Sequence, residues 1–247
     1  AAGATLALAR FQLADGKSTE AVGSARAAQH EFHALGDDKG EADALSCAAS
    51  VYLSNGVCEE AVGLFRDARR IYHLVGETAL EVTALQAIAR LLAELIQRDV
   101  DSARVPPAQV MQEALESTRD LLEYYLVVGD VPGQLTALTQ LSRLYIVCED
   151  SETALQTASD CYELASSVDD AQELASALLV LAEAYRVVGQ AETAQWAAGE
   201  AAALFEQLGE KRGLAAAKRV RDTPLAAAPH RGPASFPMRP PEEGEAP

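Results

Sequence analysis

Two short stretches of the sequence carry residue types that could do chemistry. The segment Gly16–Ser18 has the Gly-Lys-Ser order that ends a phosphate-binding P-loop. A P-loop also needs a glycine five residues earlier and a preceding strand, but Phe11 stands there within a helical pattern. His30 and His33 share one face of a helix and could bind a metal ion, yet no third ligand follows at a recognisable spacing. Because His33 and His73 occupy the same position in a repeat described below, we expect a structural role at a junction.

The sequence also contains no motif for nucleophilic catalysis or for cysteine chemistry. Serine, histidine and aspartate are all present, but no Gly-x-Ser-x-Gly or other nucleophile context appears. The four cysteines form no Cys-x-x-Cys pair and no zinc-ligand cluster, and they are too few in 247 residues for a disulfide framework. This indicates free thiols in a reducing compartment. We therefore expect a cytoplasmic protein that is not an enzyme and holds no cofactor and no metal.

Composition and charge disfavour nucleic-acid-binding, membrane-spanning and β-rich proteins. Acidic residues outnumber basic ones by 37 to 20, a net charge of -17, which disfavours nucleic-acid binding because phosphates need a positive field. No apolar run approaches the ~18 to 20 residues of a bilayer-spanning helix, and no basic segment precedes an apolar stretch as in a signal peptide. Hydrophobic residues make up 49% but aromatic residues only 5%, so the core must be built mostly from Ala, Leu and Val. That composition favours packed helices over sheets.

The sequence repeats itself with a period of 40 residues. One column of mainly aromatic residues advances by steps of 40, 53, 40 and 40, through Phe32, Tyr72, Tyr125, Ala165 and Phe205. A column of small residues keeps the same steps, through Ala21, Ala61, Ala114, Ala154 and Ala194. The shared irregular step indicates an insertion of 13 residues in the third copy.

Each copy contains two helical patterns. In the second copy, one apolar stripe runs from Ala42 to Leu53 with the period of a helix and stops at Gly56. A second stripe runs from Ala61 to Tyr72 and stops at Gly76. We therefore predict an all-α ladder of antiparallel helix pairs. The expected helices lie near 3–15, 18–35, 38–55, 58–75, 78–97, 108–128, 132–148, 151–167, 171–188, 191–208 and 211–221.

This pattern resembles the tetratricopeptide repeat (TPR), in the 40-residue variety of the LGN/Pins polarity adaptors and of large bacterial transcriptional activators. The likeness lies in the spacing A-x2-L-x2-L/A-A-x2-Y-x3-G-x3-E-A-x3-F-x2-A, which residues 42–68 match, and it covers residues 4 to about 221. It implies an α-solenoid, a right-handed superhelix of about five TPR helix pairs with a terminal helix. The repeats would span about 1–36, 37–76, 77–129, 130–169 and 170–209, with a capping helix at 210–221.

Two segments depart from the repeat. In the insertion near 96–107, we expect the helix to continue past Leu95, a loop from Asp99 to Val105 and a new helix near Pro107. That loop is either inert or functional. Seven of the ten prolines fall within 222–247, which predicts a disordered tail whose Pro-x-x-Pro is either plain tail or a docking motif.

In TPR proteins the first helix of each pair lines a concave groove. Carrying those positions across selects candidate peptide-binding residues: Arg10, Ser46, Ser50, Gln86, Arg90, Thr139, Arg143, Glu183 and Arg186. Arginine suits carboxylates because its planar fork donates two parallel hydrogen bonds. The expected ligand is an extended or helical peptide with acidic side chains or a free C-terminal carboxylate. The alternative is that these arginines are ordinary solvated residues, with Glu94 or Glu183 pairing with one of them.

The resemblance thus implies a non-enzymatic adaptor or scaffold that binds a peptide segment of a protein partner, with no nucleic acid and no membrane insertion. Two alternatives stay open. One is a sensing or dimerising solenoid domain of a larger signalling or transcriptional regulator. The other is a helical accessory domain of an enzyme.

Overall fold

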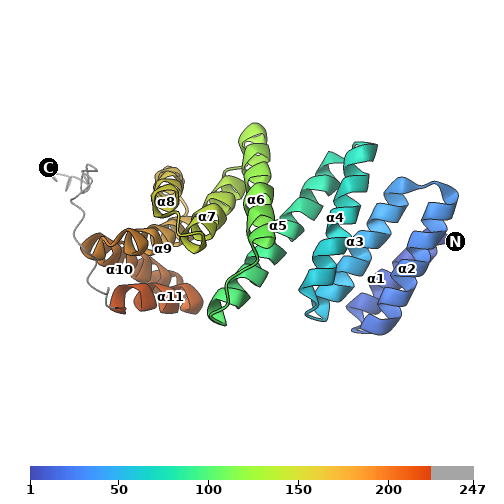
Figure 1. The fold of residues 1–247 in the computed structure, drawn as a ribbon, viewed down its shortest axis with the longest axis horizontal. Helices are drawn as coiled ribbons and strands as arrows, with labels where there is room; N and C mark the ends of the chain where they lie inside the picture. Colours follow the sequence, from blue (N-terminus) through green and yellow to red (C-terminus); the bar gives the residue numbers. More distant parts are fainter. Residues whose placement is uncertain (224–247) are drawn as a thin grey trace.

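The computed structural model describes residues 1–223 as eleven α-helices in sequential antiparallel pairs, with no strand in that range (Figure 1). The predicted all-α fold is therefore confirmed. The helices are α1 (Ala2–Ala14), α2 (Ser18–Leu35), α3 (Asp38–Ser54), α4 (Cys58–Val75), α5 (Thr78–Asp101), α6 (Ala108–Val128), α7 (Val131–Val147), α8 (Ser151–Ser166), α9 (Ala171–Val188), α10 (Ala191–Leu208) and α11 (Lys211–Asp222).

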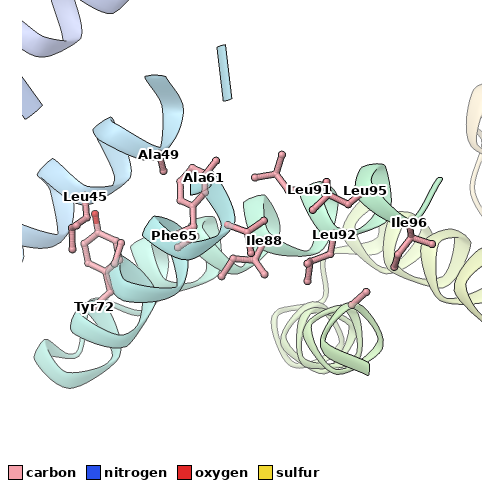
Figure 2. Close-up of a cluster of buried hydrophobic side chains, with 14 of the residues drawn as sticks. Leu45, Ala49, Ala61, Phe65, Tyr72, Ile88, Leu91, Leu92, Leu95 and Ile96 are labelled. Atoms are coloured by element: carbon pink, nitrogen blue, oxygen red, sulfur yellow. The ribbon is translucent and has the colours of Figure 1, made fainter. Parts of the chain in front are cut away.

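Each helix packs on the next one along the chain, and the core follows the whole array. Small side chains let the helices approach closely, as in α10, which buries a run of alanines: Ala194, Ala197, Ala198, Ala201 and Ala202. The largest apolar cluster runs from Leu45 on α3, through Phe65 on α4, to Ile96 on α5 (Figure 2). One helix pair could not bury these faces alone, so the repeats stabilise one another.

Four of the five turns between repeats in residues 1–223 share one construction, and the turn from α8 to α9 differs because Ser167, the residue after α8, has negative φ. α2, α4, α6 and α10 each end at a glycine with positive φ, between +68° and +76°, which a residue with a Cβ rarely adopts. After Gly36 and Gly129, an aspartate caps the next helix: Asp37 accepts a hydrogen bond from Gly40 N and Asp130 from Gly133 N. The chain therefore reverses within two residues and the next helix starts at once.

The aromatic column lies at these junctions. Phe32 packs so closely over Gly40 that a Cβ there would stand 2.2 Å from the ring, and Tyr125 lies equally close to Gly133. In the fifth repeat the residue at the glycine position is Glu173, and the aromatic position eight residues earlier is Ala165. Phe205 lies over Gly213 in the same way, so a large ring faces a glycine at three junctions. At the start of the fifth repeat, the ring and the glycine are both replaced.

The insertion lengthens α5 rather than forming mostly loop. The helix continues to Asp101, so the predicted loop from Asp99 to Val105 begins too early. In the added turns, Arg98 Nη2 lies 2.6 Å from Glu59 Oε1 of α4, an exposed ion pair between the two helices. Ala103, with φ of +55°, then ends the helical path. The expected extension past Leu95 and the restart after Pro107 are both observed.

The predicted Pro-rich tail at 222–247 lies outside the described residues, apart from its first two. Asp222 is the last residue of α11, one residue beyond the predicted end of the capping helix, and Thr223 follows it. Among residues 1–223, no helix combines the length and apolar character needed to cross a membrane.

Candidate functional site

A cleft opens between the first helices of the third and fourth repeats, α5 and α7. Its volume is about 350 Å³. These two helices contact each other sparsely, whereas α7 and α9 pack extensively. A hydrogen bond from Gln140 Nε2 on α7 to the Ala89 carbonyl on α5, of 2.7 Å, bridges the two helices. We call this site the α5/α7 cleft; it is lined by Arg90, Ala93, Glu94, Ile96, Gln97, Thr136, Thr139, Gln140, Arg143, Leu144 and Val147.

Three of the nine predicted site residues line this cleft: Arg90, Thr139 and Arg143. A fourth, Glu183, is connected through Arg143, whose Nε lies 3.1 Å from Glu183 Oε2. This is one of the two ion pairs that the sequence suggested as an alternative to ligand binding. Within residues 1–223, Arg90 is exposed and has no carboxylate at ion-pair distance. The cleft therefore presents one unpaired guanidinium and one that is partly paired.

Three other predicted residues are used within the fold. Gln86 Nε2 donates to the Tyr125 hydroxyl at 2.7 Å, which joins α5 to α6. Ser50 Oγ donates to the carbonyl of Ser46 on its own helix at 2.9 Å. Ser46 Oγ lies 3.3 Å from the Tyr72 hydroxyl, between α3 and α4. Their polar groups contribute to helix packing, and none of the three lines the α5/α7 cleft.

The last two arginines lie elsewhere along the array. Arg10, on α1, lies beside Cys47 of α3; burial raises the pKa of the Cys47 thiol, and the positive charge of Arg10 partly opposes that rise. Arg186 is half-buried in the last turn of α9. Neither lines the cleft, so the predicted residues form no single continuous site.

The sequence reasoning missed the apolar wall of the cleft. Ala93 and Ile96 of α5 and Leu144 of α7 line the cleft, and none of them stood among the predicted groove positions. The available signal was the insertion, since it predicted that the helix continues past Leu95. The same omission applies to Gln97 and Gln140, the two glutamines of the cleft.

A second cleft, of about 390 Å³, lies between α4 and α6 and is lined mainly by charged side chains. Arg66 pairs with Glu113, and Arg69 Nη2 lies 3.1 Å from Asp120 Oδ2. Because its charges neutralise one another, we interpret this cleft as a link between repeats rather than as a ligand site.

The junction histidines behave as the repeat suggested. His73 Nδ1 lies 3.2 Å from Glu81 Oε2, and His33 Nδ1 lies 2.8 Å from Glu41 Oε2. The shared repeat position of the two histidines therefore corresponds to one structural contact between a helix pair and the next. No group of three or more potential metal ligands occurs within residues 1–223.

Comparison with solved structures identifies the fold. The chain is similar to the TPR-like repeats of a putative kinesin light chain from Podospora anserina, with a TM-score of 0.64 and 18% identity over 84% of this chain and 96% of that one. It is similar to a signal-transduction ATPase with a TPR sensor from Pyrococcus horikoshii, with a TM-score of 0.64 and 16% identity over 88% of this chain and 31% of that one.

A third similar structure is the Rap conjugation gene regulator of plasmid pLS20 in complex with the Phr* peptide, with a TM-score of 0.52 and 13% identity over 88% of this chain and 57% of that one. No family model and no curated protein sequence matches the chain. The structural likenesses do not single out the LGN/Pins variety. They show that this chain has the TPR-like repeat fold.

Proposed function

We propose that this chain is a non-enzymatic adaptor that binds a peptide segment of a protein partner in the α5/α7 cleft. The observation that carries the proposal is Arg90, which has no carboxylate at ion-pair distance within residues 1–223 and lines the same cleft as Arg143 in a strongly acidic protein. The peptide complex of the Rap regulator supports it, because that protein has a similar fold.

The two arginines suit a carboxylate of the peptide, from an acidic side chain or a C-terminus. Arg143 uses its Nε for Glu183, which leaves the N–H groups of its two terminal nitrogens for a ligand. The guanidinium N–H groups of Arg90 make no ion pair within residues 1–223 and are available to a ligand. Charge-assisted hydrogen bonds from such forks are short and directional, and they fix the position of the group that they bind.

The test replaces both arginines and measures binding of a fluorescein-labelled peptide with a Glu-Leu-Glu core in a Gly/Ser background. Arg90→Glu/Arg143→Glu should weaken binding by at least about a hundredfold, because two attractions become repulsions. Folding should change little, because both side chains are exposed and the Arg143–Glu183 pair that is lost is a surface ion pair worth at most about 1 kcal/mol.

The matched control is Arg70→Glu/Arg212→Glu, which changes the net charge equally on two exposed side chains outside the cleft. Arg70 pairs with Asp67 at 3.9 Å, so the control loses one exposed ion pair just as Arg143→Glu loses its pair with Glu183. Arg69 is a poorer control because it contacts two carboxylates, Glu81 and Asp120. An equal loss in both double variants would mean general electrostatic attraction. Full binding by Arg90→Glu/Arg143→Glu would place the peptide elsewhere.

A second candidate function is a sensing solenoid within a larger signalling regulator. The similarity to the ATPase with a TPR sensor favours it, because this chain covers 31% of that protein. In that case the cleft would bind a regulatory peptide, and a further domain of the protein would respond to that binding. The full-length gene product distinguishes the two, since a regulator would carry that domain.

A further inference from the structure

We infer that one end of the α5/α7 cleft accepts a single large apolar side chain of the bound peptide, next to the carboxylate held by Arg90. This inference rests on the proposed peptide binding and specifies which peptides bind. It is carried by the apolar wall of the cleft and by the insertion that builds this wall.

The insertion is the reason that this end of the cleft exists. α5 has 24 residues, whereas α3 and α7 each have 17. In the repeat register, Glu94 corresponds to Ser54 and Val147, the last residues of α3 and α7. Ile96 and Gln97 belong to the added turns, so a repeat of ordinary length would lack them. We therefore assign the insertion a role in binding through the helix that it lengthens.

The wall consists of fixed apolar side chains. Ile96 and Leu144 are 2% and 3% exposed and belong to the large core cluster, which holds them in place. Figure 2 shows Ile96 in this cluster. Ala93 and Val147 are half-buried and offer apolar surface to the cleft. Because Ala93 is small, it leaves room between α5 and α7. The volume of about 350 Å³ lies at the lower end of the range of about 300–1,000 Å³ for pockets that bury small ligands.

The carboxylate must stand next to the apolar residue in the peptide. Arg90 precedes Ala93 by three residues, so the two lie on one face of α5, about one helical turn apart. That separation matches neighbouring side chains of a bound peptide. The preferred ligand is therefore a peptide with a large aliphatic or aromatic residue beside an acidic one.

The test uses the full chain and peptides with a Glu-X-Glu core, in which a carboxylate flanks X on both sides so that the direction of the peptide does not matter. The sequence contains four isoleucines, so the Ile δ1-methyl NMR spectrum is simple: Ile71, Ile88, Ile96 and Ile146. With X as leucine, the Ile96 signal should shift and saturate while Ile71, on α4, stays in place. With X as serine, binding should be at least about tenfold weaker, because no apolar side chain is buried.

A substitution that fills the cleft gives a second measurement. Ala93→Trp should reduce binding of the leucine peptide to the level of the serine peptide. Ala79→Trp is the matched control, because Ala79 is an exposed residue in the first turn of the same helix. A circular dichroism melt of each variant confirms that it folds.

The outcomes separate this inference from the proposed function. If binding needs Arg90 and Arg143 but leucine and serine peptides bind equally, or Ile96 does not shift, the apolar subsite is wrong and the proposed function stands. The subsite is also wrong if Ala93→Trp keeps the preference for leucine. If neither peptide binds, or both arginines are dispensable, the proposed function fails and this inference fails with it.

Discussion

Replacing Gly40 by alanine should destabilise the junction of the first two repeats, although alanine is the better helix former. Gly40 lies in the first turn of α3 beneath the ring of Phe32 from α2. A Cβ at Gly40 would stand 2.2 Å from Phe32 Cδ1 and 2.5 Å from Cε1, so the ring must move. Phe32 is only 9% exposed and packs in a cluster that includes Ala44 and Ala48, which leaves it little room to move.

The magnitude follows from two opposing effects. Adding a methyl group to a filled core costs about 1–3 kcal/mol of unfolding free energy. Replacing a glycine by alanine within a helix raises the free energy of unfolding by up to about 1 kcal/mol. The net loss is therefore about 1–2 kcal/mol. For a chain of this size, that lowers the melting temperature by about 2–8 °C.

Thermal and urea unfolding followed by circular dichroism measures this effect. The matched control is Gly23→Ala on α2, where an added Cβ has no atom within 4 Å and stability should rise by about 0.5–1 kcal/mol. The double variant Phe32→Ala/Gly40→Ala should show coupling, since removing the ring removes the clash. If Gly40→Ala is as stable as Gly23→Ala, the contact between ring and glycine does not determine the junction.

Two further predictions concern ionisable groups in the repeats. Burial and the nearby Asp170 raise the pKa of Glu173, so its ionised form destabilises the fold at neutral pH. Glu173→Gln should therefore raise the melting temperature at pH 7. The difference should shrink as the pH falls from neutral to the ordinary glutamate pKa of about 4.3, because the raised pKa lets Glu173 of the folded chain bind its proton above that value. Burial raises the pKa of the Cys47, Cys148 and Cys161 thiols alike, so access decides the order among these three. An aromatic disulfide reagent should therefore modify the exposed Cys148 before the buried Cys47 and Cys161. Peptide mapping by mass spectrometry gives the order of labelling, and early labelling of Cys161 would contradict the buried packing.

The repeat period predicts most of the fold because its signals are local. Left-handed glycines such as Gly36 and Gly76 end helices regardless of what packs around them, and the apolar stripes report which face is buried. The end of α5 was mispredicted because the added part of the helix makes contacts distant in sequence. Leu95 and Ile96 pack in the core cluster, and Arg98 pairs with Glu59 at the surface. No pattern within the insertion reports these contacts.

The candidate site was harder to predict because a helix face does not specify its neighbours. Gln86 and Arg90 lie one turn apart on the same helix, yet Gln86 bonds to Tyr125 while Arg90 lines the cleft. Which of them stays available depends on how closely α5 approaches α6 and α7. That spacing is set by packing between repeats, which a single repeat cannot encode.

The lengthened helix also explains why the cleft can be rigid. Leu95 and Ile96, on the added part of α5, are 7% and 2% exposed and pack in a cluster with Ala114 of α6 and Leu144 of α7. The wall is therefore held by the same contacts that stabilise the middle of the array. A wall that is already ordered loses little conformational entropy when a ligand binds, so more of the contact energy appears as affinity. The same packing restricts the wall to one shape, and this favours selection of one class of side chain.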